Sequence, residues 1–139
     1  MVNTNLQIAS VPQSLNLIEQ MIDDLRLEYN IPEESYGNML VALTEAVNNA
    51  IHHGNRLNPE KFVHVRCTYS KDAFCFYISD EGIGFDYYNL VDPTAPENLE
   101  KPSGRGIFLM KQLSDQLIFS ENGRAIEMHF KNNADLKVD

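Results

Sequence analysis

The sequence lacks the long apolar runs and the surplus of basic residues that membrane proteins and nucleic-acid-binding proteins need. No stretch approaches the roughly 18 consecutive apolar residues of a membrane span. The N-terminal MVNTNLQIAS has neither the basic nor the apolar region of a signal peptide. With 20 acidic residues against 11 lysines and arginines, the formal charge is -9, which opposes phosphate contacts. We expect a cytoplasmic protein that binds neither membrane nor nucleic acid directly.

Cysteine is scarce as well. The two cysteines, Cys67 and Cys75, lie in neighbouring strand-like runs and could face each other across a hairpin. A reducing cytoplasm and the lack of metal-site spacing argue against a disulfide or a zinc site. We interpret both as apolar strand residues.

The 139 residues, 43% of them hydrophobic, suit one domain with a single core, which we assign to residues 1–139. Helical spacing predicts a helix from Pro12 to about Asn30 and a second from Pro32 to Gly54, which would end it as a left-handed stop. A third helix is predicted over 104–115, and strands over 6–11, 61–69, 74–79, 116–120 and 126–130. The predicted fold is an α+β sandwich, with helices on one face of a mixed, mostly antiparallel sheet.

The second predicted helix carries an unusual polar group in the stretch LTEAVNNAIHHGN, residues 43–55. Glu45 and Asn49 lie within about 40° of each other, opposite the apolar core stripe of this helix. An asparagine oxygen is a suitable Mg²⁺ ligand, and a carboxylate one turn away could orient a hydroxyl or water and accept its proton. Taken singly, either residue could be an ordinary polar group on the surface.

A second motif, DEGIGFD at residues 80–86, follows the buried strand FCFYIS. Glycines at alternate positions, Gly82 and Gly84, would let a flat ligand approach the backbone. The carboxylate of Asp80 can accept a hydrogen bond from an exocyclic amine such as that of adenine. The motif alone could also be an acidic turn.

The third motif, SGRGIFLM at residues 103–110, is a glycine-rich loop that leads into a helix. Free N–H groups and the helix dipole favour an anion at such a terminus, and Arg105 could contact a phosphate. The same sequence pattern would also fit a flexible loop at the start of a helix that binds no anion. The dinucleotide fingerprint is excluded because the third glycine of GxGxxG is missing, and no GK[ST] of a P-loop occurs.

In this order, TEAVNNAIHHGN, DEGIGF and GRGIFLM resemble the three boxes of the Bergerat ATP-binding fold of histidine-kinase-like ATPases. The residues of the three motifs and the short length of the chain are most similar to those of the small anti-sigma-factor serine kinases. The resemblance implies that Glu45 is the catalytic base, that Asn49 binds Mg²⁺, and that Asp80 accepts a hydrogen bond from the adenine of ATP.

The resemblance also assigns the remaining pocket residues. Residues 85–103 would form the ATP lid, with Lys101 and Ser103 as lid contacts, while His53 and Gly54 would support the pocket. Gly82 and Gly84 would shape the base pocket. Gly104 and Gly106 would hold the phosphates, together with Arg105, which would lie near the transferred group.

The implied activity is phosphorylation of a serine on a STAS-domain antagonist, combined with nucleotide-dependent sequestration of a sigma factor. Relatives commonly form homodimers, and Arg26 is a candidate sigma-factor contact, although a lone exposed arginine is usually only solvated. Because the chain has no phosphoacceptor hairpin, we interpret its histidines as structural: His52, His53, His64 and His129. The alternatives are an ATP-gated binding module that acts by partner capture alone, and an ATPase fragment of a larger signalling machine.

Overall fold

The computed structural model describes residues 2–70, 72–84 and 104–132. The strands are β1 (Val2–Ala9), β2 (Phe62–Ser70), β3 (Ala73–Ser79), β4 (Gln116–Ser120) and β5 (Ala125–Lys131). The helices are α1 (Leu15–Tyr29), α2 (Glu33–Asn49) and α3 (Gly104–Leu113), with 3-10 turns η1 (Pro12–Ser14) and η4 (Glu121–Gly123) and a π-helical turn η2 (Ala50–Gly54). Within the described residues, no helix is long and apolar enough to cross a membrane.

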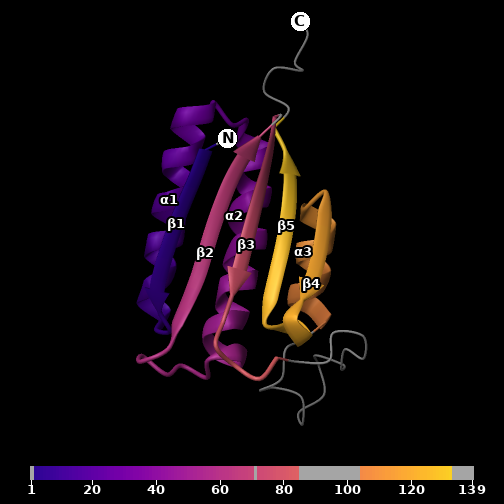
Figure 1. Ribbon diagram of the computed structural model, residues 1–139. Coiled ribbons are helices and arrows are strands. Elements are labelled where there is room, and N and C mark those ends of the chain that lie inside the picture. The colour runs from indigo at the N-terminus through magenta and orange to yellow at the C-terminus, as the bar shows by residue number, and fades with distance from the viewer. Residues whose placement is uncertain (1, 71, 85–103, 133–139) are drawn as a thin grey trace, which may run out of the picture.

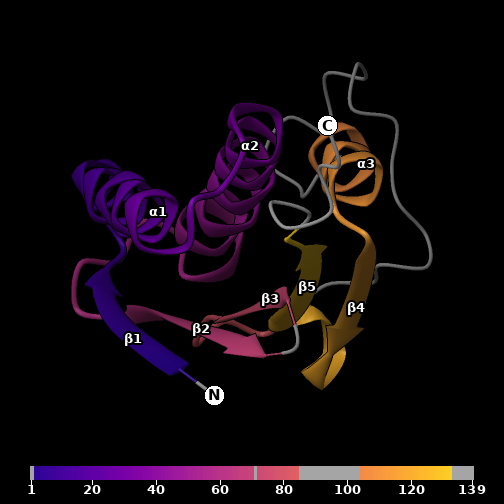
Figure 2. The ribbon, with the colours of Figure 1, turned by 90° about the horizontal axis from the view of Figure 1, so that it is seen from above.

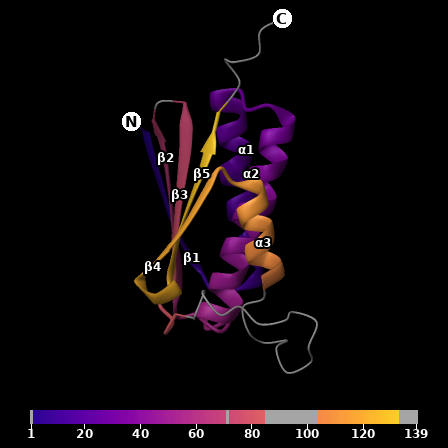
Figure 3. The same cartoon turned by 90° about the vertical axis from the view of Figure 1, so that its right-hand side faces the viewer.

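The five strands form one sheet in the order β1-β2-β3-β5-β4 (Figure 1). Each neighbouring pair is antiparallel, in agreement with the prediction of a mostly antiparallel sheet. The three helices cover a single face of this sheet, which Figures 2 and 3 show as a helical layer on one side only. The predicted α+β sandwich is therefore confirmed.

The core lies between the sheet and the helices and follows the period of two in the strands. In β2 and β3 the residues that face the helices are buried, whereas their neighbours in sequence are more exposed. The largest fully buried side chains come from both layers and include Ile18, Ile22, Met39, Leu43, Phe74, Phe76, Ile78 and Met128. This burial is what fixes the helices over the sheet.

Helix α2 is central and packs against a helix on each side (Figure 2). Its predicted core stripe is buried at Met39, Leu43 and Val47, but Ala42 and Ala46 are buried completely as well. These two alanines lie on α2 between the stripe and the polar pair Glu45 and Asn49. Small side chains on this flank let α3 approach, so the polar pair faces a neighbouring helix.

Three local predictions were wrong. The first strand covers Val2–Ala9 and not 6–11. Gly54 does not stop its helix in the left-handed conformation, which is adopted after it by Arg56 and Leu57. The two cysteines do not face each other: Cys67 opposes Phe76 and Cys75 opposes Thr68 in the β2–β3 register, so Cys67 lies toward the helices and Cys75 on the opposite face. Both are free thiols, as expected.

Candidate functional site

Helix α3 begins directly against the polar pair of α2. A Cβ atom at Gly106 would lie 3.0 Å from Oε2 of Glu45 and 3.6 Å from Nδ2 of Asn49. The first and third motifs, about sixty residues apart in the sequence, therefore meet at one place. A side chain there would push on the carboxylate, so the glycine leaves Glu45 in its present position.

The first turn of α3 adds donors to this polar pair. Gly104 and Arg105 begin the helix, and the Arg105 side chain is exposed. No acidic residue occupies this turn, so the free N–H groups and the positive end of the helix dipole meet no negative charge on their own turn. The structure thus places the N–H groups of the α3 start beside an amide and a carboxylate.

Asp80 immediately follows β3, at the end of the sheet where α2 and η2 also end (Figure 1). Its backbone N–H donates to the carbonyl of Arg124 at 3.0 Å, which continues the pairing of β3 with β5. Its Oδ1 accepts a hydrogen bond of 2.7 Å from the N–H of Gly82. The strand and the loop together hold this carboxylate in one orientation.

Two glycines press against the Asp80 carboxyl group. A Cβ at Gly54 would overlap the Asp80 side chain, and one at Gly82 would overlap the carbonyl of Gly54. The end of the first motif and the start of the second are therefore in direct contact. A side chain at Gly54 would displace the carboxylate, and one at Gly82 would displace the backbone of Gly54.

Burial raises the pKa of Asp80 above its ordinary value. The hydrogen bond from Gly82 and the charges of Arg124 and Lys61 lower this pKa but do not cancel the burial effect. The carboxylate is half-buried and, among residues 2–70, 72–84 and 104–132, accepts a hydrogen bond from the N–H of Gly82. An added donor from a ligand would compensate for the lost solvation.

Gly84 has a φ of 84°, a conformation that favours glycine, and a Cβ there would overlap the carbonyl of Asn122 in η4. The loop after β3 therefore runs along η4 with little space between the two backbones. This packing fixes residues 80–84 against the sheet.

Asn55, to which the sequence analysis gave no role, is buried where three strand ends meet. Its Oδ1 accepts a 2.7 Å hydrogen bond from the N–H of Glu81, and its Nδ2 donates to Oγ of Ser10 at 2.8 Å and to the carbonyl of Phe62 at 3.0 Å. The residue ties η2 to the ends of β1 and β3 and to the start of β2. The sequence signal was its place as the last residue of the first motif, directly after Gly54.

The turn η2 is π-helical, with the N–H of Asn55 donating to the carbonyl of Ala50, five residues before it, at 2.8 Å. A π-turn winds less per residue than an α-helix and is common at functional sites. The prediction of a continuous α-helix to Gly54 was wrong, because α2 gives way to the π-turn at Ala50. The wider turn sets the direction in which Gly54 and Asn55 meet the loop after β3.

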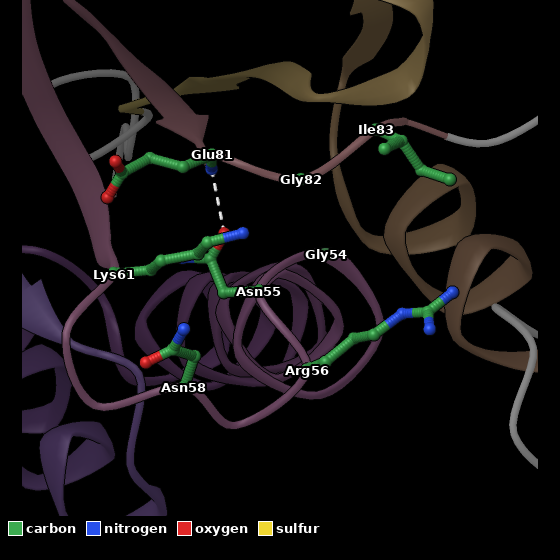
Figure 4. A pocket seen from close by; sticks show the side chains of 8 residues that line it. All are labelled: Gly54, Asn55, Arg56, Asn58, Lys61, Glu81, Gly82 and Ile83. Carbon is green, nitrogen blue, oxygen red and sulfur yellow. Dashed lines mark hydrogen bonds between the residues drawn. The ribbon is translucent and has the colours of Figure 1, made fainter.

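A cavity of about 460 Å³ opens beside this loop. Figure 4 shows Asn55 between the helix end and the loop, with its hydrogen bond to the N–H of Glu81 dashed. The lining residues are Gly54, Asn55, Arg56, Asn58, Lys61, Glu81, Gly82 and Ile83. Five of these residues belong to the ends of the first and second motifs, but Asp80, Glu45 and Asn49 do not line the cavity, which therefore adjoins the Asp80 contact.

A search of family models matches the histidine kinase-like ATPase domain over residues 8–130. The chain belongs to this family. The match includes all described residues of the three motifs, and the resemblance to anti-sigma-factor kinases that the sequence motifs suggested is confirmed.

Two curated relatives cover most of the chain. A protein named serine-protein kinase RsbW from Oceanobacillus iheyensis is 23% identical over 96% of this chain and 89% of its own length. An anti-sigma F factor from Clostridium perfringens strain SM101 is 30% identical over 70% of this chain and 72% of its own.

Among solved structures, the RsbU and RsbW domains of Rv1364c from Mycobacterium tuberculosis superimpose with a TM-score of 0.65 at 10% identity. The alignment covers 95% of this chain but spans about a third (32%) of that longer chain. At this identity the likeness supports the fold.

The donor set fits a magnesium nucleotide. Asp80 offers a half-buried carboxylate, and Asn49 offers an amide beside the first turn of α3, where N–H groups have no partner within the helix. Lys101, Ser103 and the predicted lid at 85–103 lie outside the described residues. Arg26 is exposed, but its guanidinium lies 4.4 Å from the ring centroid of Tyr36, so it is stacked and not merely solvated.

Proposed function

We propose that this protein is an ATP-dependent serine/threonine protein kinase of a partner-switching module. It would act in the cytoplasm, as a homodimer, on a STAS-domain anti-sigma-factor antagonist, and would sequester a sigma factor. The observation that carries the proposal is the contact of Gly106 with Glu45 and Asn49. It joins a hydroxyl-orienting carboxylate, a metal-binding amide and an anion-binding helix start, as phosphoryl transfer requires.

The proposed roles follow the chemistry of each group. Asp80 accepts the hydrogen bond of the adenine amine, in a base pocket shaped by Gly82 and Gly84. Asn49 binds Mg²⁺, which when bound neutralises charge on the phosphates. The N–H groups of Gly104, Arg105 and Gly106 bind the phosphates, with Ser103 as a further contact.

Glu45 would hold the serine hydroxyl of the antagonist in line and accept its proton, while the Arg105 guanidinium stabilises charge on the transferred group. Catalysis is then mainly alignment and electrostatics. The names of the relatives, serine-protein kinase and anti-sigma F factor, support this choice of substrate and partner.

The second candidate is an ATP-gated binding module that captures its partner without phosphotransfer. The two functions differ in whether they need Glu45, because a module that only captures a partner needs no general base.

The decisive experiment uses Glu45→Ala, with the exposed Glu60→Ala as a matched acid control. We would titrate each protein with ATP and Mg²⁺ by calorimetry and measure phosphate transfer from γ-labelled ATP to a STAS-domain antagonist. We expect all variants to bind ATP and Glu45→Ala to lose at least about a hundredfold in transfer rate.

Loss of ATP binding in Glu45→Ala would give this residue a structural role. Equal transfer by Glu45→Ala and Glu60→Ala would exclude it as the base. ATP binding by the wild type without any transfer, but with an ATP-dependent affinity for a sigma factor, would favour the binding module.

A further inference from the structure

The sheet face opposite the helices carries a cluster of three metal-binding side chains: Cys75 on β3, and Glu127 and His129 on β5. Cys75 and His129 are direct partners in the antiparallel register, and Glu127 is two residues from His129 on the same face. The pattern was not visible in the sequence because the ligands come from segments about fifty residues apart.

The side-chain atoms of the cluster are already close together. Nε2 of His129 lies 3.8 Å from Sγ of Cys75 and 2.9 Å from Oε2 of Glu127, and one ligand atom from each residue falls within 4.8 Å of the others. Ligands around a tetrahedral zinc ion are separated by about 3.4 to 3.6 Å, from bonds of roughly 2.0 to 2.3 Å. Small rotations would bring all three onto one ion.

The chemistry of the donors selects the metal. A thiolate and an imidazole favour Zn²⁺ over Mg²⁺ or Ca²⁺, which prefer oxygen. The thiolate and carboxylate together supply two negative charges, which balance a divalent ion. Half-burial of all three residues leaves the fourth position to water, as in open zinc sites.

Arg66 is a cation on this face whose guanidinium stacks on an aromatic ring. The guanidinium of Arg66 on β2 lies 5.0 Å from the ring centroid of Tyr77. The hydroxyl of Tyr77 donates to Glu121 and not to Glu127. A metal ion would replace the 2.9 Å pairing of His129 with Glu127 and the hydrogen bond between Cys75 and Thr68.

We propose that Cys75, Glu127 and His129 form a zinc site on the uncovered face of the sheet, remote from the nucleotide-binding motifs. The site links β3 to β5, the two strands whose ends hold Asp80 and Arg124.

Metal binding would have to displace a proton from Cys75. Burial and the nearby Glu127 carboxylate raise the pKa of this thiol, and a hydrogen bond with Thr68 and the charge of Arg66 lower it without cancelling the increase. Zinc affinity therefore rises with pH in the neutral range. Cys67 lies on the opposite face of the sheet and is not part of the cluster. Burial raises the pKa of its thiol to about 12.

The test is a titration of the full, tag-free chain with Co²⁺ as a spectroscopic substitute for zinc, without nucleotide. We expect one equivalent to give a thiolate-to-cobalt charge-transfer band and tetrahedral d–d bands, and zinc to abolish both. Cys75→Ser should lose the charge-transfer band, and His129→Gln should weaken cobalt binding by at least about tenfold.

Two controls keep the same residue types elsewhere: Cys67→Ala on the inner face of β2, and His64→Gln, an exposed histidine on the outer face. Both should bind cobalt as the wild type does, and circular dichroism reports the fold of every variant. The proposal is wrong if the wild type gives no charge-transfer band, if Cys75→Ser keeps it, or if His129→Gln binds cobalt unchanged.

Discussion

Asp80 shows how burial of a single carboxylate can lower the stability of the fold. It is held by Gly82 and crowded by Gly54, and its pKa is raised mainly by burial. Below its unfolded value of 3.8, the group is protonated in both states and has no effect. As pH rises above that value, the folded state holds the proton longer, so folding stability falls until the raised pKa is passed. At neutral pH the full penalty is present.

We therefore expect Asp80→Asn to be more stable than the wild type at neutral pH and to lose this advantage on acidification. Urea unfolding from about pH 8 to about pH 4 would measure the change. In the same variant, loss of a charge-assisted hydrogen bond of about 1.5 to 3 kcal/mol should weaken ATP binding roughly 10- to 150-fold. A less stable Asp80→Asn at neutral pH would contradict the burial argument.

At the scale of elements, the contact between α2 and α3 sets the position of Glu45. An added methyl at Gly106 meets the end of a flexible side chain at 3.0 Å, so Glu45 can move aside without unfolding the helix. Gly106→Ala should therefore leave stability unchanged or raise it by up to about 1 kcal/mol. We expect phosphotransfer to fall at least about tenfold, measured with labelled ATP.

Gly37→Ala is the matched control for this prediction. Gly37 lies in α2, and a Cβ there would meet nothing within 4 Å. It should gain helix stability of up to about 1 kcal/mol without loss of activity. Equal activity of the two variants would mean that Gly106 does not position Glu45.

Asn55 joins the end of η2 to three strand ends, so its effect is on several elements together. Asn55→Ala would leave the Glu81 N–H and the Phe62 carbonyl without this partner, and we expect a loss of about 2 to 4 kcal/mol in unfolding free energy. The exposed turn bond of Asn58 is the control, since Asn58→Ala should cost under about 1 kcal/mol. Chemical denaturation measures the unfolding free energy of both variants. An equal loss of unfolding free energy in Asn55→Ala and Asn58→Ala would refute the role given to Asn55.

At the scale of the whole molecule, the site is assembled by the packing of helices on the sheet, so ligand binding and folding should be coupled. Mg²⁺ and ATP at about 100 times the dissociation constant should stabilise the fold by about 2.7 kcal/mol, which raises the melting temperature by roughly 10 °C. In Asn49→Ala the additional shift from Mg²⁺ should be lost. Thermal unfolding with ATP alone and with ATP plus Mg²⁺ separates the contribution of the nucleotide from that of the metal. If Mg²⁺ still raises the melting temperature of Asn49→Ala, Asn49 is excluded as the metal ligand.

The sequence by itself determined the class of fold and the three motifs. The period of two in β2 and β3 and the helical spacing in α1 and α2 are local, and so are the glycine patterns around Asp80 and Gly106, because each depends on residues close together in the chain. The tertiary structure alone decided the contacts between distant segments. These include the burial of Ala42 and Ala46 under α3, the π-turn before Asn55, and the meeting of Cys75 with His129, since each depends on which elements pack side by side.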